Sequence, residues 1–231
     1  MLVLGFLKPD GVLRRAAGAK IVQGLLESNL GRFLTFRETT LPTAMLEEHY
    51  RHVRNREFYP WMIDLLTGSP SYVALIETTP DALEKLRRLL GYTRAHQAHP
   101  QSLRYRFAPF GGMNGFHLSE DTQAAQAEVG LWQRHIDLSP GQFTVPVTDY
   151  VRQYAHGVDH TFLLREKCLE IKTKGRPIQA QDVARLRDLM AEECLDATPA
   201  QVDWLAQKLA EGCFLGEVTN PPTYDSDDLW A

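Results

Sequence analysis

The stretch Leu2-Val3-Leu4-Gly5-Phe6-Leu7-Lys8-Pro9-Asp10-Gly11 opens the chain with a short apolar run that stops at a turn. A continuous apolar run of this length, bounded by proline and glycine, predicts a buried β-strand. Apolar residues then recur at helical spacing from Ala17 to Leu26, and Gly31 is suited to end a helix. The beginning of the chain therefore predicts a strand followed by an amphipathic helix.

Strand and helix patterns continue irregularly as far as Trp132. Further strands are expected at Phe33–Thr39, Ser71–Thr78 and Asn114–His117, and further helices at Thr43–Val53, Phe58–Leu66, from Thr79-Pro80 to Gly91, and from Ser119-Glu120-Asp121 to Trp132. Residues 91–113 show no clean periodicity, and a structureless stretch of that length usually carries function. The strands are too few and too irregularly spaced for a doubly wound sheet. We predict an α+β sandwich with helices packed on an antiparallel sheet.

The character of the chain changes after Trp132. Residues 1–132 carry 15 Lys and Arg against 13 Asp and Glu, whereas residues 133–231 carry 10 against 16. Beyond a Pro140-Gly141 connection, four more helices are expected at Thr148–Tyr154, His160–Ile171, Ala180–Cys194 and Pro199–Leu209. We therefore predict a first domain at 1–135 and a helical extension at 136–231, which ends in an acidic tail that we expect to be mobile.

Composition excludes several classes of protein. A net charge of −4 without a concentrated basic face argues against a nucleic-acid groove. The first apolar run is too short and lacks the basic flank of a signal peptide, so neither a leader nor a membrane span is expected. Three widely spaced cysteines argue against a disulfide framework or a zinc knuckle, which favours a reducing cytoplasm.

Glu128 is the most unusual residue of the first domain. It lies on the apolar stripe of its helix, between Ala125 and Trp132, where a carboxylate needs a partner. His117 is a candidate, with Ser119 as a bridging hydroxyl, and a salt bridge to an arginine is the alternative. A histidine oriented by a glutamate acts as base, nucleophile or metal ligand. Because no second His or Cys stands nearby at ligand spacing, a metal is the weakest of the three interpretations.

Several short motifs are weak indicators of a protein family one by one, but as an ordered set they are specific. The set is Lys8-Pro9-Asp10-Gly11-Val12, Glu48-His49-Tyr50, Arg56-x-Phe58, Gly91-x-Thr93, Leu103-Arg104 and Asn114-Gly115-Phe116-His117-x-Ser119, with Glu128 eleven residues after the histidine. In order and spacing this set resembles the nucleoside diphosphate kinase family over Leu2 to Trp132. The resemblance implies a ferredoxin-like sandwich with a four-stranded antiparallel sheet, followed here by a mainly α-helical domain.

The resemblance also implies a role for each matching residue. His117 is expected to take the γ-phosphoryl group of a nucleoside triphosphate on its Nδ1 and to pass it to a nucleoside diphosphate, with Glu128 and Ser119 orienting its ring. Lys8 matches a lysine near the transferred phosphate, and Asn114 matches an asparagine that bonds the ribose. The remaining matches are Tyr50, which lines the site, Phe58, which lies under the base, and Arg87, Thr93 and Arg104, which hold phosphates. Mg²⁺ is expected to arrive on the nucleotide phosphates, with no separate protein metal site.

Some positions depart from the family's pattern. The usual His-Gly-Ser-Asp-Ser run is His117-Leu118-Ser119-Glu120-Asp121 here, and the family's Gly-Asp-Phe is Tyr105-Arg106-Phe107. Met113 stands for an arginine, Gly111 for a small apolar residue near the base, His52 for an acid, and Ala95 for a loop proline often involved in subunit contacts. These departures bear on rate, base packing and assembly.

The expected protein is thus a cytoplasmic phosphotransferase acting on nucleoside di- and triphosphates, without nucleic-acid or membrane partners. It is expected to be a homo-oligomer, with a dimer favoured over a hexamer. The alternative is an inactive family member that serves as an interaction module through its helices. His156 and His160, four residues apart, are read as surface residues rather than metal ligands, and the extension is not expected to supply a catalytic group.

Overall fold

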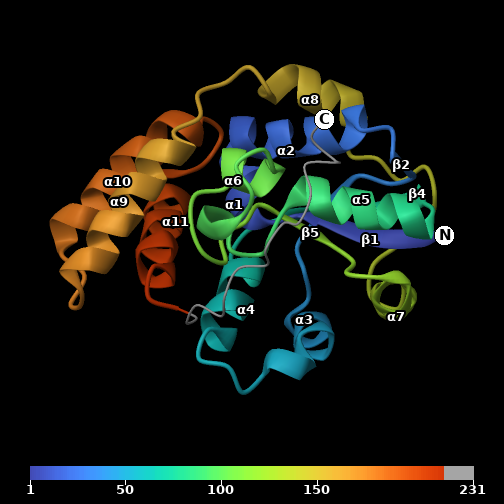
Figure 1. The fold of residues 1–231 in the computed structure, drawn as a ribbon, viewed down its shortest axis with the longest axis horizontal. Coiled ribbons are helices and arrows are strands. Elements are labelled where there is room, and N and C mark those ends of the chain that lie inside the picture. Colours follow the sequence, from blue (N-terminus) through green and yellow to red (C-terminus); the bar gives the residue numbers. More distant parts are fainter. Residues whose placement is uncertain (216–231) are drawn as a thin grey trace.

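The computed structural model describes residues 1–215 of the chain. The first part is built around a central antiparallel sheet. Of the helices of the extension, three lie together at one end of this sheet, and the fourth packs over one of its faces (Figure 1). The predicted acidic tail lies outside the described residues. Among residues 1–215, no helix is both long and apolar enough to cross a bilayer.

The sheet has four positions in the order β2-β4-β1-β5, with the outermost position shared by two short strands. The strands are β1 (Leu2–Leu7), β2 (Gly31–Phe33), β3 (Arg37–Thr39), β4 (Ser71–Thr78) and β5 (Phe116–Leu118). Both β2 and β3 pair with β4, β4 pairs with β1, and β1 pairs with β5. The predicted strand at Phe33–Thr39 is therefore interrupted. The Leu34 and Thr35 N–H groups both point to the Leu75 carbonyl, and Phe36 forms a bridge with Phe143 instead of β4. The expected sandwich is confirmed.

Alternating side chains divide the core between the two faces of the sheet. Val3 and Leu7 of β1 join a cluster with α2 (Arg15–Glu27), α5 (Pro80–Leu90) and α8 (Val147–Tyr154). Leu4 and Phe6 join a second cluster with α3 (Thr43–His49), α4 (Tyr59–Thr67) and α7 (Thr122–Trp132). Figure 1 shows α2 and α8 on one side of the sheet and α3 and α7 on the other. His117 pairs with Phe6 and stacks on its ring, so the histidine lies on the second face.

Three helical segments were not expected from the sequence. Residues after the first strand form the short helix α1 (Pro9–Leu13) rather than a simple turn. Residues 91–113, predicted to be without regular structure, contain a 3₁₀ turn at Ala95–Gln97 and the helix α6 (Leu103–Phe107). The expected helix at Thr43–Val53 stops at His49 and continues as a 3₁₀ turn at Arg51–Val53. Segments this short hold too few turns for periodicity to be recognised.

The four expected helices of the extension are present. They are α8 (Val147–Tyr154), α9 (Thr161–Lys174), α10 (Ala180–Glu193) and α11 (Pro199–Gly212). The last begins with a capping box in which Thr198 and Gln201 satisfy each other's backbone groups. Its neighbours α9 and α10 form a third apolar cluster with α11, and Leu13, Leu65, Phe110 and Met113 of the first part contribute to the same cluster. The proposed boundary at 135 thus separates segments that share a core.

A buried ion pair fastens the extension to the first part. The Arg14 guanidinium donates to both carboxylate oxygens of Glu193, at 2.6 and 3.0 Å, with side chains that are 2% and 0% exposed. A second arginine, Arg165 of α9, reaches from the extension into the first part. It donates to the carbonyls of Tyr105, Ala108 and Pro109 at the end of α6. Cations at the carboxyl end of a helix are favourable. The extension therefore holds the segment that carries Arg104.

Candidate active site

His117, Glu128 and Ser119 form a connected group at the sheet surface. The His117 Nε2 lies 3.1 Å from the Glu128 Oε2, and the Ser119 hydroxyl donates to the same oxygen at 2.7 Å. The Ser119 oxygen also accepts from the Leu4 backbone N–H at 3.0 Å, which ties the group to β1. The partner that Glu128 needed on its apolar stripe is therefore the histidine rather than an arginine.

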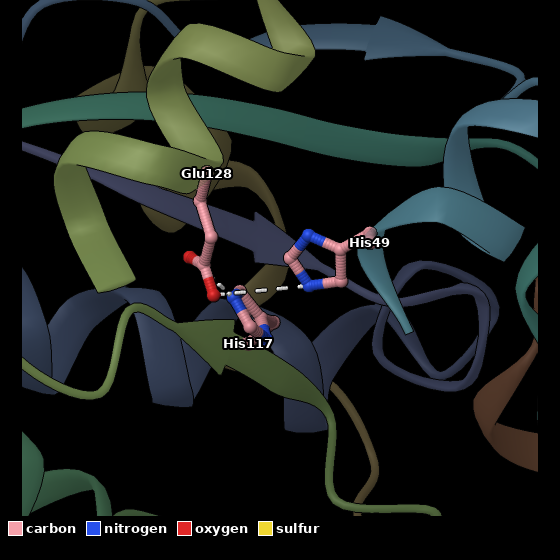
Figure 2. A group of neighbouring side chains, drawn as sticks. All are labelled: His49, His117 and Glu128. Carbon is pink, nitrogen blue, oxygen red and sulfur yellow. Dashed lines mark hydrogen bonds and ion pairs between the residues drawn. The ribbon is translucent and has the colours of Figure 1, made fainter. Parts of the chain in front are cut away.

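This contact decides which nitrogen of His117 is available. A carboxylate accepts only, so the Nε2 facing Glu128 carries the proton and Nδ1 keeps its lone pair. In Figure 2 the second ring nitrogen points away from the carboxylate. Burial lowers the pKa of His117, although Glu128 opposes that shift. The ring is consequently neutral near pH 7, with Nδ1 ready to act as a nucleophile.

Glu128 stays ionised beside this neutral ring. Burial alone would raise the pKa of the Glu128 carboxyl, but His117, His49 and the Ser119 hydroxyl lower it to about 2. Near neutral pH the carboxylate can therefore fix the His117 tautomer, and it can stabilise positive charge that develops on the ring.

His49 joins the group from α3, and sequence spacing did not reveal it. Its Nε2 lies 3.8 Å from the Glu128 Oε1 (Figure 2), whereas His117 and Ser119 contact Oε2. Burial lowers the pKa of His49 to about 3, and the Trp132 indole N–H donates to its Nδ1 at 3.0 Å. The ring is thus neutral with its proton on Nε2, so it presents an N–H to Glu128. Two distant parts of the chain meet here, and only the fold brings them together.

His49, His117 and Glu128 are also close enough to hold a metal ion. A histidine ligand needs an unprotonated nitrogen. The Trp132 contact places the His49 proton on Nε2, the nitrogen that faces Glu128. With the proton on Nδ1 instead, the His49 N–H would point at the Trp132 indole N–H, and the hydrogen bond between them would be lost. The residues therefore suit an arrangement that orients Glu128 better than a metal site. His156 and His160 do not share a helix, because His160 caps α9 and contacts Glu192.

Three cations stand around His117. Lys8, at the end of β1, is 8% exposed, and burial lowers its pKa to about 8, with Asp10 opposing the shift and Arg104 adding to it. Arg104 is buried and donates to the carbonyls of Gly91 and Phe116 at 2.7 and 2.6 Å. Arg87 donates to the Leu118 carbonyl at 2.9 Å. These backbone contacts fix the guanidinium groups in advance, so a polyphosphate would meet positioned positive charge.

Asn114 and Thr93 meet at the mouth of the same site. The Asn114 amide N–H donates to the Thr93 carbonyl at 2.8 Å. The Asn114 Oδ1 is buried and has no hydrogen-bond partner within residues 1–215. A buried acceptor without a donor is costly. A ligand hydroxyl at this point would supply that donor.

Most of these side chains line one cavity of about 380 Å³. Nine of the predicted site residues are on its walls, namely Lys8, Tyr50, Phe58, Arg87, Thr93, Arg104, Asn114, His117 and Glu128. Ser119 lies behind Glu128 and touches the cavity only through it. Tyr50 is 6.4 Å from the His117 ring, edge to face, and burial raises the pKa of its hydroxyl.

Other wall residues were given no role by sequence reasoning. They are Val53, Trp61, Met62, Arg94, Gly112, Ala124 and, from the extension, Gly212 and Leu215, besides His49. Trp61 and Met62 lie one helical turn from Phe58, so that spacing could have suggested them. Nothing in the sequence connects Gly212 and Leu215 with residues 150 positions earlier. The extension was expected to supply no catalytic group. Its described part reaches the cavity wall with Gly212 and Leu215, neither of which has a titratable side chain.

Several departures from the family pattern face the extension. Met113, where an arginine was expected, is fully buried in the apolar cluster that α9, α10 and α11 form. The Tyr105 carbonyl accepts from Arg165 of the extension, whereas the Phe107 carbonyl accepts from Arg14 of the first part. Leu118 is buried in the cluster beneath the sheet and lines the cavity only in part. Met113 and Tyr105 therefore contact the added helices directly.

Comparison with known proteins agrees with this geometry. The family model described as nucleoside diphosphate kinase matches residues 3–138. A nucleoside diphosphate kinase of Staphylococcus haemolyticus is 30% identical over 133 residues, which is 58% of this chain and 87% of that protein. One from Parafrankia is 34% identical over 126 residues, 54% of this chain and 90% of that protein.

Solved structures show the same fold. A halophilic nucleoside diphosphate kinase from Halobacterium salinarum in complex with CDP superimposes with a TM-score of 0.53 at 24% identity, covering 65% of this chain and 97% of that one. The Aquifex aeolicus enzyme gives 0.52 at 23% identity, covering 60% and 97%.

Proposed function

The chain belongs to the nucleoside diphosphate kinase family and is a phosphotransferase acting on nucleotides, and we propose that His117 carries the phosphoryl group between them. In the first half-reaction, Nδ1 of His117 attacks the γ-phosphorus of a nucleoside triphosphate. The N–P bond forms as the bond from phosphorus to the β,γ-bridging oxygen breaks, and a nucleoside diphosphate leaves. In the second half-reaction, the terminal phosphate oxygen of another diphosphate takes the group and restores His117.

The observation that carries this proposal is the contact from His117 Nε2 to Glu128 Oε2. It keeps the proton on the nitrogen that faces the carboxylate and leaves the lone pair on the other one. As phosphorylation makes the ring cationic, the ionised Glu128 stabilises the charge without reorganising.

Phosphoryl transfer asks the protein mainly for position and charge neutralisation. Lys8, Arg87 and Arg104 supply fixed positive charge on the wall beside His117. The substrate enters as its Mg²⁺ complex, with the ion carried on the phosphates, which needs no cage of protein ligands. The Oδ1 of Asn114 accepts from the ribose hydroxyl, consistent with its lack of a donor among the described residues.

The base stacks against Phe58, which does not discriminate between one base and another. Phe58 offers a π-face, and every base has one, so a stacking contact tolerates all four bases. Broad use of nucleotides follows. The alternative, an inactive interaction module, is disfavoured because the nucleophile, its orienting carboxylate and three cations share one cavity.

A labelling experiment tests the proposal. Protein incubated with γ-labelled ATP should acquire label that is stable to base and labile to acid, as a phosphohistidine is. Addition of unlabelled GDP should then discharge the label into GTP. Label that is acid-stable, or that GDP does not discharge, contradicts a phosphohistidine relay.

A further inference from the structure

The end of the extension forms part of the wall of the nucleotide cavity. Among the described wall residues, Gly212 and Leu215 are the two that come from beyond residue 138. Building on the proposed function, we propose that the extension completes the nucleoside end of the site within the same chain, with the Leu215 side chain packing against the bound nucleoside.

Contacts along α4 and α11 hold the two helices together. The Trp61 indole N–H donates to the Lys208 carbonyl at 3.0 Å, and the Lys208 ammonium lies 2.5 Å from the Asp64 carboxylate. Further along, Trp204 packs on Gly68, where an added Cβ would come within 2.2 Å of the indole ring. Since Phe58 directly precedes α4, these contacts fix α11 relative to the predicted base-stacking residue.

The Trp61 ring is packed between two glycines. A Cβ on Gly112 would meet the ring at 3.1 Å, and one on Gly212 would meet it at 2.8 Å. Real Cβ atoms essentially never lie as close as the second value, so only glycine lets the end of α11 reach this position. Leu215 follows within one turn, and its N–H contacts the Gly212 carbonyl at 3.3 Å.

Gly111 lies against the end of α11, at a distance where an added Cβ would be in ordinary van der Waals contact. Gly111 has a φ of +55°, and a Cβ there would lie 3.4 Å from the Gly212 carbonyl oxygen. The family pattern expects a small apolar residue near the base at this position. Here the extension comes against the glycine instead, and Leu215 supplies an apolar side chain to the same cavity.

The chemistry of the wall identifies the part of the nucleotide that Leu215 meets. Lys8, Arg87 and Arg104 surround His117, so the phosphates belong at that end. Near α11 the wall is formed by Phe58, Trp61 and Met62. An apolar side chain gains by removing nucleoside surface from water and offers nothing to a phosphate. Leu215 therefore contributes to nucleoside binding alone.

Paired titrations test this inference. Binding of ADP and of inorganic tripolyphosphate, each with Mg²⁺, is measured by calorimetry for wild type, Leu215→Ala and Leu195→Ala. Leu195 is 76% exposed, lies in the same extension and is absent from the cavity wall, so it controls for loss of a leucine there. Loss of a partly buried leucine contact should weaken ADP binding of Leu215→Ala by about fivefold. Tripolyphosphate binding should not change, Leu195→Ala should match wild type, and Leu215→Met should regain most of the ADP affinity.

Two results overturn the inference. One is ADP affinity of Leu215→Ala within twofold of wild type, and the other is an equal loss of ADP and tripolyphosphate binding. Because titration needs no turnover, it is separable from the proposed function. Wild-type protein that binds ADP but never becomes labelled refutes the phosphohistidine relay, while the titration still decides on Leu215. Failure of wild type to bind ADP refutes both.

Discussion

Removal of the Glu193 carboxylate tests whether the extension and the kinase domain form one folded unit. Glu193→Ala leaves Arg14 buried at 2% exposure without its bidentate partner. Burial alone would lower the pKa of Arg14, and Glu193 and Asp159 raise it. In the variant Asp159 remains, and a guanidinium is effectively always protonated in proteins, so the arginine stays charged. Breaking a buried pair from one side costs about 3–5 kcal/mol.

The remaining partners place the expected loss at the lower end of that range. Arg14 keeps the Thr161 hydroxyl at 2.8 Å and the Asp159 carboxylate at 3.6 Å. We therefore expect the free energy of unfolding to fall by about 3 kcal/mol, which for a chain of this size lowers Tm by about 6–12 °C. Denaturant unfolding followed by circular dichroism, with calorimetry for Tm, measures both quantities.

The matched control is Glu84→Ala, which removes a glutamate that is 68% exposed and pairs with Arg88 one turn away. Such a pair contributes about 0.5 kcal/mol or less. A double variant, Arg14→Met with Glu193→Leu, should recover much of the loss, since no charge stays buried and unpaired. If Glu193→Ala is no less stable than Glu84→Ala, the pair does not join the two parts as described.

Three further outcomes follow from the same contacts. Burial lowers the pKa of His49 to about 3, against 6.5 when unfolded, so the unfolded state binds the extra proton and the free energy of unfolding falls as pH drops below about 6.5. At pH 5.5 His49 accounts for about 1 kcal/mol of that loss. His49→Gln should remove this contribution, whereas the control His135→Gln, at an exposed position, should keep it. Phe58→Ala should weaken nucleotide binding by about 1–3 kcal/mol with little change in preference among bases. A loss confined to adenine or guanine nucleotides contradicts a stacking contact that accepts every base. Light scattering on the full chain should give a dimer, since Ala95 replaces the loop proline and an added domain can block larger assembly, and a hexamer refutes that reasoning.

The sequence predicts those helices and strands whose residue patterns are local. The runs Leu2–Leu7 and Ser71–Thr78 have the bounds of β1 and β4 as the structure has them, because uninterrupted apolar runs and their flanking turns are both local features. All four helices of the extension were foreseen for the same reason. The short helices α1 and α6 were missed, since five residues are too few for a period to show.

The candidate site likewise contains residues that local spacing reveals and residues that only the packing of the fold brings in. His117, Ser119 and Glu128 lie in one strand, the turn after it and the helix that follows, so spacing alone was informative. His49 comes from α3, and its relation to Glu128 depends on the packing of two helices on the sheet. Leu215 reaches the cavity only because Gly212 and Gly112 allow close approach to Trp61, a steric condition that no spacing reveals.

The departures at Met113 and Gly111 were read as doubts about rate and base packing. In the structure, Met113 is covered by the extension's apolar cluster, and Gly111 lies against the end of α11. Both positions thus contact the added domain. A resemblance confined to residues 2–132 could not reveal those contacts.

The most direct test of the central claim is the intact mass of the protein after brief exposure to Mg²⁺-ATP at neutral pH. Wild type and the exposed control His135→Gln should each gain the mass of one phosphoryl group and lose it when GDP is added, whereas His117→Gln should gain none. A phosphoryl group on His117→Gln, formed and discharged as in wild type, would show that another residue carries the transferred group.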